Sequence, residues 1–117
     1  MRVINLIVVH CSATRADRDF TEQDLEVCHR RRGMNGPGYH FYIRKNGDIK
    51  TTRPIEKIGA HARGYNAHSI GICYEGGISE RGRPADTRTV WQKHSLRVLV
   101  RMLLVDYPGC RVCGHRD

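Results

Sequence analysis

The sequence predicts a single α/β domain in which a mixed β-sheet is flanked by helices. Three observations support this fold class. Apolar, β-branched runs lie near both ends of the chain and in its middle, two segments with helical apolar spacing separate them, and one Lys-Asn-Gly-Asp turn joins two strand-like runs. The chain has 117 residues, which is typical of one domain with its own hydrophobic core.

The first two predicted elements are a buried strand and a short helix. Residues 3–10 (VINLIVVH) contain no turn residue and predict a strand that ends at His10. Residues 20–36 predict a helix with both ends marked. At the start, Thr21 stands three residues before Asp24. At the end, the last turn contains three arginines, and a glycine follows them.

The remaining elements follow in the order hairpin, strand, helix, strand. Residues 38–51 carry the Asn-Gly turn of a hairpin. Residues 54–69 are rich in Gly, Ala, His and Asn without periodicity, which predicts a loop of the kind that often carries function. Residues 69–77 predict a strand, and residues 89–107 predict the longest helix because their apolar residues recur at helical spacing. Residues 110–115 predict a final short strand.

The net charge of +8 favours a polyanionic partner, which could be nucleic acid, an anionic envelope polymer or acidic lipid. The longest apolar run, residues 6–9, is too short to cross a bilayer, so we expect no membrane insertion. Nucleic-acid binding would require basic residues interleaved with exposed aromatics on one surface. The arginines are instead dispersed over loops and helix ends, and we expect no nucleic-acid partner.

Five cysteines at irregular spacings, without a signal-peptide pattern, predict reduced thiols in a protein made in the cytoplasm. In the final stretch GCRVCGHRD, Gly114 separates Cys113 from the histidine and so excludes haem attachment. A zinc knuckle would need a second ligand pair, and a redox pair would favour a helix N-terminus. Cys11 and His10 are adjacent in a strand and point to opposite faces, which disfavours a catalytic dyad.

Two histidines stand out because each closes an apolar strand. If the strands that end at His10 and His115 are neighbours, both imidazoles could reach one metal ion. The alternative for each is a hydrogen-bonded structural histidine. We expect His29, His68 and His94 to lie at the surface.

Four segments together resemble a known family: VVHCSAT, GYHFYIRKNGDI, GAHARGYNAHSIGICYEGG and GHRD. They resemble the type 2 N-acetylmuramoyl-L-alanine amidases, a zinc amidase family that includes phage lysozyme-type amidases and is related to peptidoglycan recognition proteins. The match is collinear over almost the whole chain, and its third segment is the most specific. The resemblance implies that residues 1–117 form an amidase domain with the amidase/peptidoglycan recognition protein-like fold.

The resemblance also implies roles for four residues. His10 and His115 match zinc ligands, Tyr39 matches the catalytic tyrosine beside the metal, and His61 matches a substrate-binding histidine of the cleft. The implied function is zinc-dependent hydrolysis of the amide between N-acetylmuramic acid and L-alanine, in a cell-wall lysin of the phage or prophage type. The alternative function is a non-catalytic peptidoglycan-binding module, and Tyr39 could instead be a core-packing aromatic.

The sequence departs from the family pattern at its end. Family members place a third ligand, a cysteine or aspartate, downstream of the second histidine, with a catalytic lysine or similar residue just before it. This chain stops at Asp117, so we expect a domain that lacks its C-terminal tail, folds, but holds zinc weakly and cleaves slowly. Cys113 or Asp117 could substitute. We expect a monomer that is made in the cytoplasm and acts on the cell wall.

Overall fold

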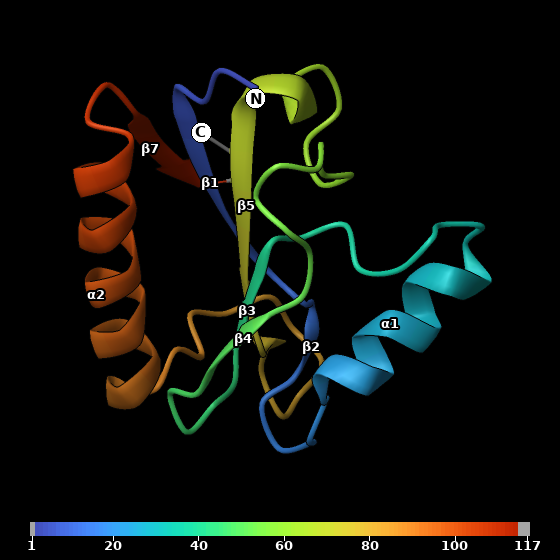
Figure 1. Cartoon of the computed structure of the whole chain (residues 1–117). Coiled ribbons are helices and arrows are strands. Elements are labelled where there is room, and N and C mark those ends of the chain that lie inside the picture. The colour runs from blue at the N-terminus through green and yellow to red at the C-terminus, as the bar shows by residue number, and fades with distance from the viewer. Residues whose placement is uncertain (1, 115–117) are drawn as a thin grey trace.

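The computed structural model describes residues 2–114 and contains a five-stranded mixed sheet with the order β4-β3-β5-β1-β7 (Figure 1). The neighbours from β3 to β7 run parallel, and β4 pairs with β3 antiparallel as the predicted hairpin. The strands are β1 (Leu6–Cys11), β3 (Phe41–Ile43), β4 (Ile49–Thr51), β5 (Ser69–Tyr74) and β7 (Arg111–Gly114). The predicted mixed sheet is confirmed.

Two α-helices lie on opposite sides of this sheet (Figure 1). Helix α1 spans Glu22–Arg31 and α2 spans Val90–Asp106, and both begin with a capping box. In each box the threonine hydroxyl accepts the backbone N–H three residues later, and the side chain at that position accepts the N–H of the threonine. No helix in the described part of the chain is long and apolar enough to span a bilayer.

Three short elements were not predicted. Strands β2 (Thr14–Arg15) and β6 (Gly77–Ile78) pair in parallel as a second, two-stranded sheet, and η1 (Asn66–His68) is a single 3-10 turn. Elements of two or three residues are too short to show a period of hydrophobic residues, so sequence patterns do not reveal them.

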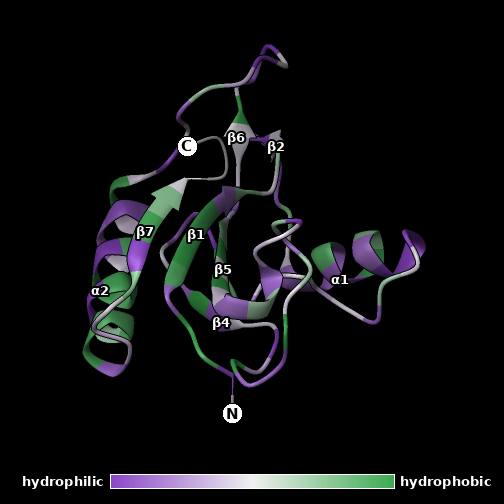
Figure 2. Cartoon of the chain, turned by 90° about the horizontal axis from the view of Figure 1, so that it is seen from above, coloured by the Kyte–Doolittle hydropathy of each residue, from purple (hydrophilic) through white to green (hydrophobic). Residues whose placement is uncertain are grey.

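The main hydrophobic core lies between the sheet and α2. Alternate residues of β1 point to opposite faces, so Ile7 faces α2 while Leu6, Val8 and His10 share the other face. Figure 2 shows hydrophobic β1 between the two helices. The buried residues of this core come from three strands and from α2, namely Ile7, Ile43, Ile70, Ile72, Leu99 and Leu103.

The opposite face of the sheet is covered in two parts. Leu25 of α1 packs against Tyr42 and Cys73 in a second, smaller cluster. Beside it, the loop between β4 and β5 folds over Gly71, where the ring of His61 lies against the strand. This face, away from α2, therefore carries the polar groups described below.

A buried carboxylate connects the elements that surround the sheet. Glu75, which directly follows β5, is 1% exposed. Its carboxylate accepts the Arg44 Nε–H at 2.7 Å and the backbone N–H groups of Phe20 at 2.7 Å and Lys45 at 2.9 Å. Its backbone carbonyl accepts from Gln92 Nε2 of α2 at 2.8 Å. Glu75 thus holds the segment before α1, the end of β3 and the start of α2 together.

We predict that Glu75→Gln lowers the free energy of unfolding by about 3 kcal/mol, because one partner of a buried ion pair is removed while Arg44 stays in place. The exposed Glu80 provides the control, and Glu80→Gln should leave stability within about 0.5 kcal/mol of the parent. Urea denaturation of the three proteins measures the difference. Equal midpoints for the parent and Glu75→Gln would contradict the prediction.

Candidate functional site

The candidate site is centred on His10, near the C-terminal end of β1. Its side chain is 6% exposed. The Nε2 atom of His10 lies 2.9 Å from Nδ1 of His61, and the two rings meet edge to face with centroids 5.0 Å apart. The structure therefore brings together two of the four residues selected from the sequence, although 51 positions separate them along the chain.

His61 is held in place by its own loop and by the strand beneath it. The backbone N–H groups of His61 and Ala62 both donate to Asn66 Oδ1 at 2.9 Å. The ring lies so close to Gly71 that a Cβ there would come within 2.6 Å of it, so a side chain at that position would displace the imidazole. Nε2 of His61 lies 3.1 Å from Ser69 Oγ.

Tyr39 lies beside both His10 and His61. Its ring centroid is 5.1 Å from that of His10 and 6.4 Å from that of His61. Burial, and secondly the neighbouring Cys73 thiol, raise the pKa of the Tyr39 hydroxyl above its usual value. The hydroxyl therefore keeps its proton at neutral pH and is available as a hydrogen-bond donor.

The prediction that His29 lies at the surface is wrong. His29 is 6% exposed, its Nδ1 accepts the backbone N–H of Gly38 at 2.9 Å, and its ring packs 5.4 Å from that of Tyr39. The physical reason is that His29 follows Leu25 by four residues and shares its buried helix face. Burial, followed by the charges of Arg32 and Arg53, lowers the pKa of His29.

Sequence reasoning missed His40, which is fully buried. Its Nδ1 accepts from the backbone N–H of Gly71 at 3.0 Å, and its Nε2 donates to the carbonyl of Lys57 at 2.8 Å. Its ring lies edge to face with His61, with centroids 5.9 Å apart. Burial lowers the pKa of His40, so the neutral ring braces the loop that carries His61. The sequence feature that could have indicated its burial is its place in a run of residues that is otherwise aromatic and apolar.

The strand that contains His10 and the strand that ends before position 115 are neighbours, as the shared-ion hypothesis requires. Strand β7 pairs with β1 in parallel, and Gly114 is the partner of Val9. His115 itself, together with Asp117, lies outside the described residues. Within residues 2–114 no group of three His, Cys, Asp or Glu side chains is arranged to hold a metal ion.

The cysteines and the other two histidines behave largely as expected. All five cysteines are free thiols. The Cys11 side chain lies against Gly77 while His10 faces His61, so these neighbours form no dyad. Burial raises the pKa of Cys110, which is the opposite of what a reactive thiol needs. His94 is exposed, and His68 is half-buried beside Tyr65.

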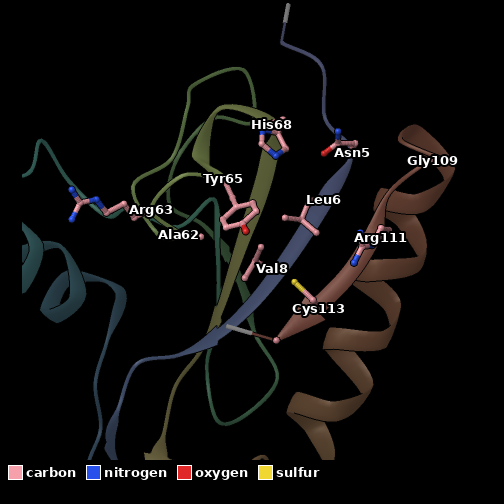
Figure 3. Close-up of a pocket in the computed structure, with 11 residues that line it drawn as sticks. Asn5, Leu6, Val8, Ala62, Arg63, Tyr65, His68, Gly109, Arg111 and Cys113 are labelled. Atoms are coloured by element: carbon pink, nitrogen blue, oxygen red, sulfur yellow. The ribbon is translucent and has the colours of Figure 1, made fainter. Parts of the chain in front are cut away.

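A groove of about 700 Å³ lies on the same face of the sheet as His10 (Figure 3). Leu6 and Val8 form its floor, and both share a strand face with His10. Figure 3 shows the ring of Tyr65 beside Val8, with Arg111 on the β7 side of the groove. The groove thus combines an apolar floor with polar and basic groups at its edges, the character of a binding site for an extended, partly polar ligand.

A comparison with protein families identifies the family of this chain. The model of the N-acetylmuramoyl-L-alanine amidase family matches residues 1–117. The chain belongs to this family. The family resemblance inferred from the sequence is confirmed, and amidases of this family are generally zinc-dependent.

Similar proteins include a phage endolysin, a bacterial amidase and an insect peptidoglycan recognition protein. An endolysin of Klebsiella phage KP32 is 39% identical over 111 residues, which span 95% of this chain and 74% of the relative. The structure of N-acetylmuramoyl-L-alanine amidase LysC from Clostridium intestinale URNW superimposes with a TM-score of 0.84 at 38% identity, covering 97% of this chain and 71% of that chain. Drosophila PGRP-LB gives a TM-score of 0.77 at 25% identity and covers 99% and 71%. The predicted amidase/peptidoglycan recognition protein fold is confirmed.

The lowered pKa values at the site predict how stability of this amidase-family protein changes with pH. His29 and His40 have folded-state pKa values below the unfolded value of about 6.5, so the unfolded chain binds protons more readily. Their stabilising contribution is complete above about pH 6.5 and is lost as the pH falls towards their folded-state pKa values. We therefore expect the melting temperature to fall on acidification below that pH.

The variant His29→Asn isolates one of these contributions, because the Asn oxygen can replace Nδ1 as the acceptor for Gly38 without titrating. We expect its melting temperature to depend less on pH than that of the parent. His94→Asn, at an exposed position, should keep the dependence of the parent. Identical pH profiles for His29→Asn and the parent would show that His29 does not titrate with unfolding.

Proposed function

We propose that this protein is an N-acetylmuramoyl-L-alanine amidase that hydrolyses the amide between the lactyl group of N-acetylmuramic acid and L-alanine in peptidoglycan. The observation that carries the proposal is the cluster of His10, Tyr39 and His61 on the face of the sheet that also carries the groove, in a chain of the amidase family. The endolysin relatives support a cell-wall lysin of the phage or prophage type.

The residues present fit a zinc ion. His10 offers a buried imidazole whose other nitrogen is held by a hydrogen-bonding partner, which is the usual arrangement of a histidine ligand. We propose that His10 and His115 hold the ion. The parallel pairing of β1 with β7 supports this choice, since His10 follows Val9 and His115 follows its partner Gly114. Zinc supplies a Lewis acid and an activated water when bound at such a site.

Tyr39 is proposed as the catalytic hydrogen-bond donor. When water attacks an amide carbonyl, negative charge develops on the carbonyl oxygen, and a donor already in place stabilises it. Tyr39 lies beside His10 and keeps its proton because burial raises its pKa. It can therefore donate without losing the proton at neutral pH. Ala62, the residue after His61, lines the groove. The proposal that His61 contacts substrate follows from the family resemblance.

The groove and the net charge suit a peptidoglycan substrate. The apolar floor of Leu6 and Val8 can take the methyl groups of alanine and lactyl units, and the edges can bind the carboxylates of a peptide stem. A net charge of +8 favours association with an anionic wall. We propose that the protein acts on the cell wall as a monomer.

The proposed function is tested by incubating the protein with purified peptidoglycan and zinc. An amidase releases new amino groups from L-alanine and creates no new reducing sugar ends. We expect His10→Ala to abolish amine release and His94→Ala, at an exposed position, to retain it. Binding to the wall without amine release would support the non-catalytic binding module instead, and new reducing ends would indicate a glycosidase.

For Tyr39→Phe we predict a fall in turnover of about a hundredfold, the usual effect of removing one oxyanion donor, with zinc binding unchanged. Tyr107→Phe is a matched control, because Tyr107 packs on the core beside α2, away from the groove. Initial rates of amine release and zinc content measure the two effects. Unchanged turnover would contradict the catalytic role and support the alternative, in which Tyr39 is a core-packing aromatic residue.

A further inference from the structure

We propose that His61 is a positioning residue that fixes the tautomer of His10, so that His10 presents Nδ1 to the metal. The proposal rests on the metal site proposed above. It follows from a line of three polar side chains that runs from His10 through His61 to Ser69. The two contacts in this line are 2.9 Å between His10 Nε2 and His61 Nδ1, and 3.1 Å between His61 Nε2 and Ser69 Oγ.

The direction of these hydrogen bonds follows from simple proton accounting. A neutral imidazole has one N–H donor and one acceptor nitrogen, and only the nitrogen without a proton can bind a metal. His10 uses Nε2 to contact His61, so we assign Nδ1 to the metal and the proton to Nε2. His61 must then accept at Nδ1 and carry its own proton on Nε2, which donates to the Ser69 hydroxyl.

The surroundings of His61 hold its ring in the orientation that this line requires. Asn66 fixes the backbone on either side of the ring through two hydrogen bonds. Gly59 and Gly71 leave the space that the ring occupies, since a Cβ at either position would come within 2.7 Å of His61 Cδ2. Ser69 is fully buried on β5, so the line ends on the sheet itself.

The proposed role differs from substrate contact because it acts through His10. A histidine ligand is made more basic and is oriented by the group that accepts its second N–H, and loss of that group weakens metal affinity by about 10- to 100-fold. Carboxylates and backbone carbonyls are common acceptors for this purpose. A neutral imidazole that accepts at one nitrogen carries its proton on the other, and for His61 that proton needs Ser69 as its acceptor. The position of one proton on His61 thereby sets the proton on His10.

Two substitutions at residue 61 separate positioning from packing. In His61→Asn, the side-chain oxygen can stand near the Nδ1 position and accept from His10, whereas His61→Leu offers no acceptor. We expect His61→Leu to bind zinc about 10-fold more weakly than the parent, and His61→Asn to recover most of that loss. Affinity is measured by competition with a chromophoric zinc chelator.

The tautomer of His10 is read directly from long-range ¹H–¹⁵N spectra of the imidazoles, recorded without added metal at about pH 8, where histidine is neutral. We expect the proton on Nε2 in the parent and in His61→Asn, and a mixture of tautomers in His61→Leu. Thermal melts of each variant report folding. If His61→Leu does not fold, Ser69→Ala provides the same comparison, since it removes the acceptor at the end of the line and should weaken zinc binding in a folded protein.

Three results would overturn the proposal. The first is that the His10 proton lies on Nδ1 in the parent protein. The second is that His61→Leu folds and keeps the zinc affinity and the His10 tautomer of the parent. The third is that His61→Asn folds but binds zinc as weakly as His61→Leu. Neither measurement requires hydrolysis. A protein that shows the expected tautomers and zinc affinities but releases no amine from peptidoglycan would refute the proposed amidase function and leave the role of His61 supported.

Discussion

The parallel pairing of β1 between β5 and β7 is the constraint on which the rest of the structure depends. The register places Leu6 opposite Ser69, Val8 opposite Gly71, and His10 opposite Cys73, so these residues share the face of the sheet away from α2. Successive strand residues alternate in direction, and the same strand therefore supplies Ile7 to the main core. A slip of one residue in this register would exchange the two sets and bury His10 in the core.

The functional face is organised by polar contacts, whereas the face under α2 is organised by apolar packing. On the functional face the loop between β4 and β5, which includes the 3-10 turn η1, lies over the strand. It keeps its shape because Asn66, Ser69 and His40 satisfy polar groups around it. Among the described residues, no buried side-chain nitrogen or oxygen lacks a hydrogen-bond partner. Such fully paired networks give a loop one conformation, which a site that must hold a ligand and orient a substrate requires.

Burial also sets the protonation of the groups that surround His10. The pKa values of His29 and His40 are lowered and that of Tyr39 is raised, and in each case burial is the largest cause. All three shifts favour the uncharged form. Burial thus keeps the tyrosine in the form that donates a hydrogen bond.

The sequence by itself determined the strands of the five-stranded sheet, both helices with their threonine caps, the hairpin and the family. Local patterns decide these features, because a buried strand, a capping box or an Asn-Gly turn depends on residues close together in the chain. Only the tertiary structure decided that His61 contacts His10, that His29 is buried, and that His40 braces the loop. These contacts join residues far apart in the chain or depend on which helix face meets the sheet. Hydrophobic periodicity carries no information on which polar side chains meet, since that follows from strand register and loop conformation.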